Sequence, residues 1–232
     1  MAREFDRNMF VMLLAVMVGV IIITYFVADI VNRSKMETLT TQYEGEITTV
    51  KFKSKNFTSH FLKSSVVLDQ AREDRAFGNY HFDLGFLWYR SALAEKNSSL
   101  MDLYKLRGID NCTNAMPYYY NSHLNFEEAQ GYFDDTKSCA DEEYLNMLDL
   151  YVNLTGLGSQ LTMLRYNASR YLMYLTENLT FDAGTNSVEY LVNVSGLLGL
   201  FDAAMAAYGG MAQEYEEIQD EIDEYEFFEE ER

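Results

Sequence analysis

A long apolar stretch with a single charge constrains this 232-residue chain more than any other feature. Residues 9–31 read MFVMLLAVMVGVIIITYFVADIV, and the only charge among these 23 residues is Asp29, two positions from the end. A helix of this length spans roughly 35 Å, which is enough to cross the hydrocarbon core of a bilayer with some tilt. Tyr25 and Phe26 would lie at headgroup depth, where aromatic side chains are common. The stretch predicts a transmembrane anchor, preceded by a short cytoplasmic leader at residues 1–8.

The alternative interpretation is a cleaved secretory signal. The apolar core of such a signal is normally only about 7–15 residues, and a small residue is required three positions before the cut. A cut after Ala28 would place Phe26 at that position, which is unfavourable. The sequence therefore favours an uncleaved signal-anchor.

Eight of the fifteen asparagines lie in the pattern Asn-x-Ser/Thr, the acceptor sequence for N-linked glycans. With 28 Ser and Thr in the chain, chance would supply only roughly two. Glycans are added on the extracytoplasmic side, so the excess predicts an outward-facing chain with its N-terminus in the cytoplasm and its C-terminal domain outside the cell. Helix capping by Asn could explain one or two sites but not eight. The candidate acceptors are Asn32, Asn56, Asn97, Asn111, Asn153, Asn167, Asn178 and Asn193.

The net charge of −18 makes binding to nucleic acid or to anionic headgroups unfavourable. Eleven Asp and Glu lie between residues 213 and 232, against a single Arg. We therefore interpret residues 212–232 as an acidic tail, expected to fray or be disordered unless divalent cations or a basic partner neutralise it. Divalent cations are accordingly candidate ligands of this tail.

A helical stripe of apolar and small residues follows the anchor and predicts a stalk at residues 32–77. Serine occupies two of its eight positions, which favours a bundle helix over a stable dimeric coiled coil. The stripe comprises Ile47, Val50, Ser54, Phe57, Phe61, Ser64, Leu68 and Ala71.

Gly78-Asn79 is a candidate helix break, and it begins the predicted ectodomain at residues 78–211. Together with Leu84-Gly85, and later with residues 126–129 and Tyr132-Phe133, it resembles pieces of tetratricopeptide hairpins. The resemblance implies small residues where two antiparallel helices touch and aromatic residues beside them. No 34-residue period joins the pieces, so it implies a packing pattern and no family.

Further along the chain, helical spacing predicts helices at 116–123, 125–139, 141–156 and 157–179, with a connection at 108–117 and a turn at 181–187. Residues 190–211 are apolar enough to resemble a second membrane span. Asp202 near the centre, four glycines and the sequon at Asn193 favour a buried bundle helix instead. The expected fold class is all-α: one N-terminal transmembrane helix continuing into a bundle or αα-hairpin ectodomain.

Cys112 and Cys139 are the only two cysteines. In an oxidising compartment a free pair would be unusual, so we expect a disulfide. Two short helices joined near residues 123–125 would bring the two cysteines together at the open end of a hairpin.

The sequence contains no recognisable catalytic constellation. The three histidines, His60, His81 and His123, have no Cys or His within a helical turn to build a metal site, and no cofactor is implied. We expect a structural or protein-interaction role at the cell membrane rather than an enzyme. A ligand-binding sensory or accessory subunit is the alternative, and an enzyme is the third reading. The expected partners are the membrane, other membrane or cell-surface proteins, and a second copy of the chain.

Overall fold

A computed structural model describes the backbone of residues 2–225 and the side chains of residues 33–225. Four helices account for most of this part of the chain, so the expectation of a mainly helical fold is confirmed. The chain divides into two compact units, Met1–Lys53 (unit 1) and Ser54–Arg232 (unit 2). The elements are α1 (Ala2–Ala94), α2 (Ser98–Lys137), α3 (Glu142–Glu177), β1 (Leu179–Asp182), β2 (Ser187–Tyr190) and α4 (Ser195–Asp223).

The predicted leader at 1–8, the predicted anchor at 9–31 and the sequon at Asn32 lie outside the residues whose side chains are described. Among residues 33–225, no helix combines the length and the hydropathy needed to cross a bilayer.

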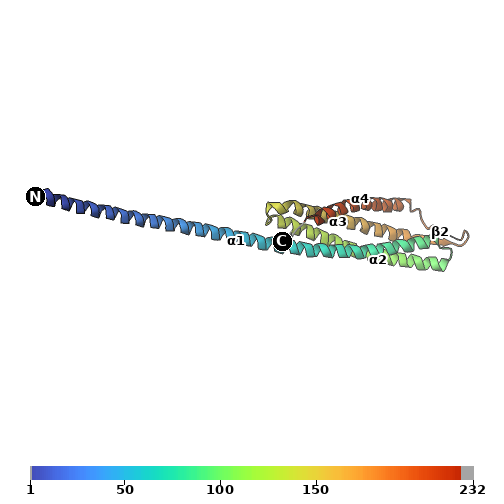
Figure 1. Ribbon diagram of the computed structural model, residues 1–232. Coiled ribbons are helices and arrows are strands. Elements are labelled where there is room, and N and C mark those ends of the chain that lie inside the picture. Colours follow the sequence, from blue (N-terminus) through green and yellow to red (C-terminus); the bar gives the residue numbers. More distant parts are fainter. Residues whose placement is uncertain (1, 226–232) are drawn as a thin grey trace. The chain divides into compact units, whose positions relative to one another are not determined.

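Unit 2 is a four-helix bundle in which the C-terminal part of α1 packs with α2, α3 and α4. A few residues join α1 to α2 and α2 to α3, and a longer segment that contains both strands joins α3 to α4. Helices that follow one another along the chain run antiparallel (Figure 1). Ser122 Oγ on α2 donates a hydrogen bond to the Ala71 carbonyl on α1 at 2.7 Å. Arg72 on α1 donates to the Tyr215 hydroxyl on α4 at 3.3 Å, and it also hydrogen bonds Gln219. These contacts place α2 and α4 on either side of α1.

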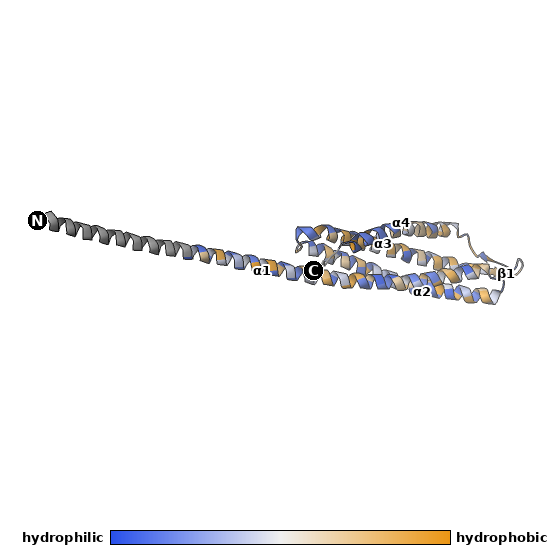
Figure 2. Cartoon of the chain, viewed as in Figure 1, coloured by the Kyte–Doolittle hydropathy of each residue, from blue (hydrophilic) through white to orange (hydrophobic). Residues whose placement is uncertain are grey.

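The bundle buries two groups of apolar side chains, one toward the hairpin and one toward the α2–α3 connection. The first includes Phe82, Tyr119 and Leu172, and the second includes Leu68 and Phe126. Hydrophobic and hydrophilic residues alternate along each helix of unit 2, as Figure 2 shows. Because each helix is amphipathic, burial of its apolar face rather than its intrinsic propensity stabilises it.

Small residues allow α1 and α2 to approach closely. A Cβ at Gly85 would lie 2.7 Å from Cys112 Sγ, and a Cβ at Gly78 would lie 2.7 Å from Cε1 of Tyr119. The expectation of small residues at an antiparallel helix contact is therefore confirmed. The break expected at Gly78-Asn79 is wrong, because α1 continues to Ala94. Here glycine serves close packing rather than a turn.

Helix α2 is also continuous where the sequence predicts a connection at 108–117 and two shorter helices. Pro117 lies inside α2 and cannot donate the usual backbone hydrogen bond four residues back. Ala115 and Tyr119, two positions before and after the proline, are both fully buried. We infer that their packing offsets the local cost of the proline. In the same way, α3 runs through the boundary expected at residues 156 and 157.

A pair of glycines tests how tightly α2 and α3 pack. A Cβ at Gly158 would lie 2.4 Å from Cε1 of Phe126, whereas a Cβ at Gly131 has nothing within 4 Å. Gly158→Ala should destabilise unit 2 by about 1–3 kcal/mol through overpacking. Gly131→Ala should stabilise it by up to about 1 kcal/mol, because alanine favours an exposed helix. Chemical denaturation of both variants measures the difference, and equal effects would contradict the packing described here.

The turn predicted at 181–187 is part of an antiparallel β-hairpin, a feature that the sequence reading missed. Leu179 pairs with Tyr190, and Asp182 pairs with Ser187. Asp182 accepts hydrogen bonds from the Gly184 backbone N–H and the Thr185 hydroxyl, which lowers the pKa of its carboxyl. Strands of four residues are too short to show a clear alternation in sequence.

Helix α4 extends beyond the segment predicted as a buried helix. The helix expected at 190–211 begins only at Ser195, and within that range it buries one face, at Phe201 and Ala204. It then continues to Asp223 through the first half of the predicted acidic tail. Tyr215 and Ile222 are only 6% and 4% exposed. The expectation of a frayed tail is therefore wrong for residues 212–223, because this stretch has an apolar face that the bundle covers. Residues 226–232 lie outside the described part of the chain.

Candidate interaction surface

The seven sequon asparagines whose side chains are described all lie at the surface. Asn97, Asn153 and Asn193 are exposed, and Asn56, Asn111, Asn167 and Asn178 are partly exposed. None of these seven is buried. An oligosaccharide on any of them would therefore project away from the core.

Helix capping accounts for only some of these asparagines. Asn97 is the N-cap of α2, and its side chain accepts a hydrogen bond from the Leu100 backbone N–H at 3.1 Å. Asn193 accepts from the backbone N–H of Ser195 at the start of α4, and Asn178 is the C-cap of α3. The other four described sequons lie within helices, where asparagine is not a preferred residue. They are Asn56, Asn111, Asn153 and Asn167.

The predicted disulfide between Cys112 and Cys139 is wrong for this structure, in which both cysteines are free. Cys112 lies inside α2 and Cys139 follows its end, so about 25 helical residues separate them. This is roughly 38 Å of helix, whereas a disulfide needs Cα atoms within about 7 Å. The prediction failed because it assumed a hairpin at 123–125, where α2 is continuous. Burial raises the pKa of the Cys112 thiol to about 12, which makes it unreactive at neutral pH.

An open groove of about 410 Å³ lies between α2, α3 and α4. Gln130, Asn153, Gln160 and Glu214 are among its lining residues, so its wall is largely polar. Gln130 donates to the Val152 carbonyl at 3.2 Å across the α2–α3 contact. Asn153 is one of the exposed sequon residues and lines the groove, so a glycan attached there would begin at the groove wall. The groove therefore does not resemble the enclosed apolar site of a small-molecule ligand.

One histidine contacts a serine on one side and a glutamate on the other, as in a catalytic triad. The three residues are Ser159, His123 and Glu127. His123 Nδ1 shares a hydrogen bond with Ser159 Oγ at 2.8 Å, and its Nε2 lies 3.6 Å from Glu127 Oε1. Ser159 is only 7% exposed, lies in the middle of α3 and does not line the groove. The neighbouring backbone N–H groups belong to the helix and are not directed at a substrate oxygen. We assign these contacts to packing between α2 and α3.

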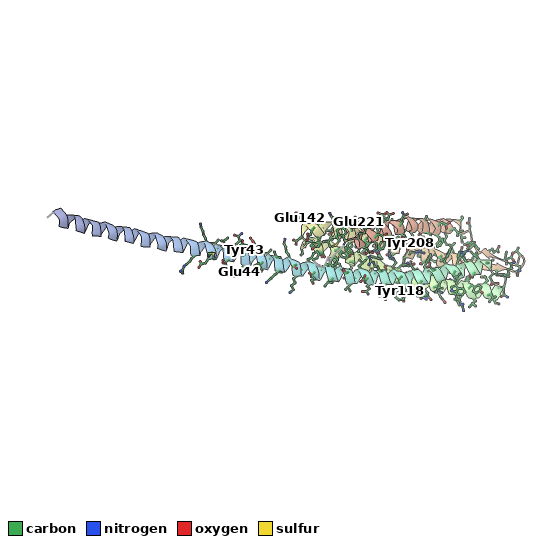
Figure 3. The ribbon with its side chains drawn as sticks, viewed as in Figure 1. Tyr43, Glu44, Tyr118, Glu142, Tyr208 and Glu221 are labelled. Atoms are coloured by element: carbon green, nitrogen blue, oxygen red, sulfur yellow. The ribbon has the colours of Figure 1, made fainter. Side chains whose placement is uncertain are left out.

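Unit 1 exposes several large apolar side chains. Met36, Tyr43, Ile47 and Val50 are 66%, 61%, 52% and 65% exposed. Figure 3 shows Tyr43 projecting from its helix. The sequence reading assigned Ile47 and Val50 to a bundle helix. That assignment is wrong for these two residues, because both side chains are more than half exposed.

The outer face of α4 is strongly acidic toward its C-terminus. Glu214, Glu216, Glu217, Asp220 and Glu221 are all exposed. Within the described residues, no group of three or more acidic, His or Cys side chains lies close enough together to hold a metal ion. Residues 226–232, which complete the acidic sequence, lie outside that search.

No protein-family model matches the chain, and no curated protein or solved structure matches it either.

Proposed function

We propose that this protein is a single-pass membrane glycoprotein that presents a helical bundle on the extracytoplasmic side for contact with other proteins. The apolar stretch at 9–31 would be the anchor, with residues 1–8 in the cytoplasm. Unit 2 would be the glycosylated, extracellular part. The expected partners are proteins of the membrane or cell surface.

The observation that carries this proposal is the set of sequons inside helices. Eight sequons are about four times the number expected by chance. Capping gives a structural reason for Asn97, Asn178 and Asn193, but not for Asn56, Asn111, Asn153 and Asn167. All four of these have solvent-accessible side chains. Glycan attachment is the role that fits both their sequence pattern and their position.

Exposed tyrosines support a role in protein contact. Tyr43, Tyr80, Tyr120 and Tyr174 are 61%, 61%, 50% and 43% exposed. Tyrosine provides a large amphipathic contact area at a small cost in side-chain entropy, and it is enriched at recognition surfaces. The acidic face of α4 would favour basic partners or divalent cations by the same complementarity.

Two measurements on membranes test the proposed topology. Alkaline carbonate extraction should leave the full chain in the membrane pellet, whereas a variant lacking residues 9–31 should be released or should fail to enter the membrane. Protease added to sealed endoplasmic-reticulum vesicles should leave unit 2 intact until detergent opens them. Digestion of unit 2 in sealed vesicles would place it on the cytoplasmic side and contradict the proposal.

A further inference from the structure

Four of the six large apolar side chains exposed in unit 1 follow the spacing of a coiled-coil seam, and the other two, Leu39 and Phe52, lie outside it. In a heptad labelled a to g, Met36, Tyr43 and Val50 occupy successive d positions, and Ile47 occupies an a position. Each of these four side chains is more than half exposed. The described part of the chain supplies no helix that covers them.

The same register continues without a break into the part of α1 that belongs to unit 2. Counting on in sevens from Val50 gives Phe57, Ser64 and Ala71, and counting on from Ile47 through Ser54 and Phe61 gives Leu68. In unit 2, Ser64, Leu68 and Ala71 are at most 2% exposed, because they face the bundle. In unit 2, these a and d positions of the register are therefore buried against other helices. In unit 1, the apolar side chains at a and d positions would be buried only by a partner helix.

We propose that unit 1 pairs with unit 1 of a second copy of this chain as a parallel, in-register, two-stranded coiled coil. Such a pair would bury Met36, Tyr43, Ile47 and Val50 against their own counterparts. The parallel direction rests on the proposed function. If both copies are anchored in the same membrane by residues 9–31, the helices that follow the anchors leave the membrane on the same side and run in the same direction.

Charge complementarity supports a second copy as the occupant. Glu46 is at a g position and Lys51 is at the following e position, and both are exposed. In a parallel pair the g residue of one helix faces the next e residue of the other. Glu46 therefore faces Lys51 of the partner subunit, and symmetry repeats the opposite-charge pair on the other side. No like-charged g–e pair is created by residues 33–53 in this register.

Cysteine cross-linking of the full chain in membranes tests the pairing. The variants Met36→Cys and Val50→Cys are made in a Cys139→Ser background, with Cys112 retained because it is fully buried. Two identical d residues of a parallel dimer lie within reach of a disulfide. Phe52→Cys is the matched control, because Phe52 is 66% exposed like Val50 but occupies an outward f position. Mild oxidation followed by non-reducing electrophoresis measures the dimer fraction.

The expected result is efficient dimer formation by Met36→Cys and Val50→Cys, at least fivefold above Phe52→Cys. Cross-linking by only one of the d variants would reject the parallel register, since an antiparallel pair brings at most one identical position together. Equal cross-linking by all three, or by none, would overturn the proposal. These outcomes are independent of glycosylation and of carbonate extraction, so dimerisation and the proposed function can fail separately.

Discussion

Ending the chain after Met211 should lower the free energy of unfolding of unit 2 by about 3–6 kcal/mol. The truncation removes Tyr215 and Ile222, which are 6% and 4% exposed, and burial of each such side chain contributes about 1.5–3 kcal/mol. It also removes Tyr215 and Gln219, the two α4 residues that accept hydrogen bonds from Arg72 on α1. A frayed or disordered tail, as expected from the sequence, would instead leave the fold intact after this cut. Thermal and chemical unfolding followed by circular dichroism distinguish the two expectations.

A point substitution isolates the contribution of Tyr215. The centroid of its ring lies 4.3 Å from Cζ of Arg75 and 6.3 Å from the centroid of the Phe126 ring. Tyr215→Ala should therefore cost about 3–5 kcal/mol. Glu217→Ala, two residues further on an exposed face of the same helix, should change stability by less than about 0.5 kcal/mol. Similar small effects for both would show that the C-terminal half of α4 is not part of the core.

Raising the pH above about 10 should destabilise unit 2 steeply, because its buried tyrosines resist ionisation. Burial raises the pKa of Tyr119 above its ordinary value of 10.0, and burial together with the hydrogen bond to Tyr190 raises that of Tyr89. The unfolded chain ionises near pH 10 while the folded chain stays neutral. Stability is therefore fully present below that pH and is lost as the pH rises. Each tyrosine should contribute a loss of about 1.4 kcal/mol per pH unit.

The variant Tyr119→Phe separates this effect from general alkaline damage. It keeps the buried ring but removes the ionisable hydroxyl, which donates to Asn79 Oδ1 at 2.8 Å. Below pH 9 it should cost about 1 kcal/mol for the lost hydrogen bond. Between pH 10 and 11.5 the free energy of unfolding of the variant should fall less steeply than that of the parent. The two slopes should differ by about 1.4 kcal/mol per pH unit. Identical slopes would show that Tyr119 ionises in the folded protein.

The apolar pattern predicted much of the helical content and part of the core. Leu68 and Ala71 were placed on a buried stripe by their spacing alone, and both are buried. Close packing at Gly85 was also predicted correctly. The buried stripe depends on local periodicity, which a sequence displays directly, whereas the packing at Gly85 was implied by the resemblance to tetratricopeptide hairpins.

The errors arose where tertiary packing overrides a local signal. Gly78 and Pro117 are typical helix breakers, but both lie inside helices that pack closely against each other. The break wrongly expected near residue 123 then led to the wrong cysteine pairing. Near the C-terminus, the charges around Tyr215 and Ile222 masked the apolar face that these two residues form.

Site-specific glycan mapping tests the central claim of an extracytoplasmic bundle most directly. Protein isolated from its native host would be digested to peptides, and mass spectrometry would identify the occupied asparagines. We expect glycans on the exposed residues Asn97 and Asn153, and on one or more of Asn56, Asn167 and Asn178. Asn114 and Asn146, which lie outside any sequon, are internal controls and should be unmodified. Unmodified asparagine at every sequon would contradict the external location and the membrane topology proposed with it.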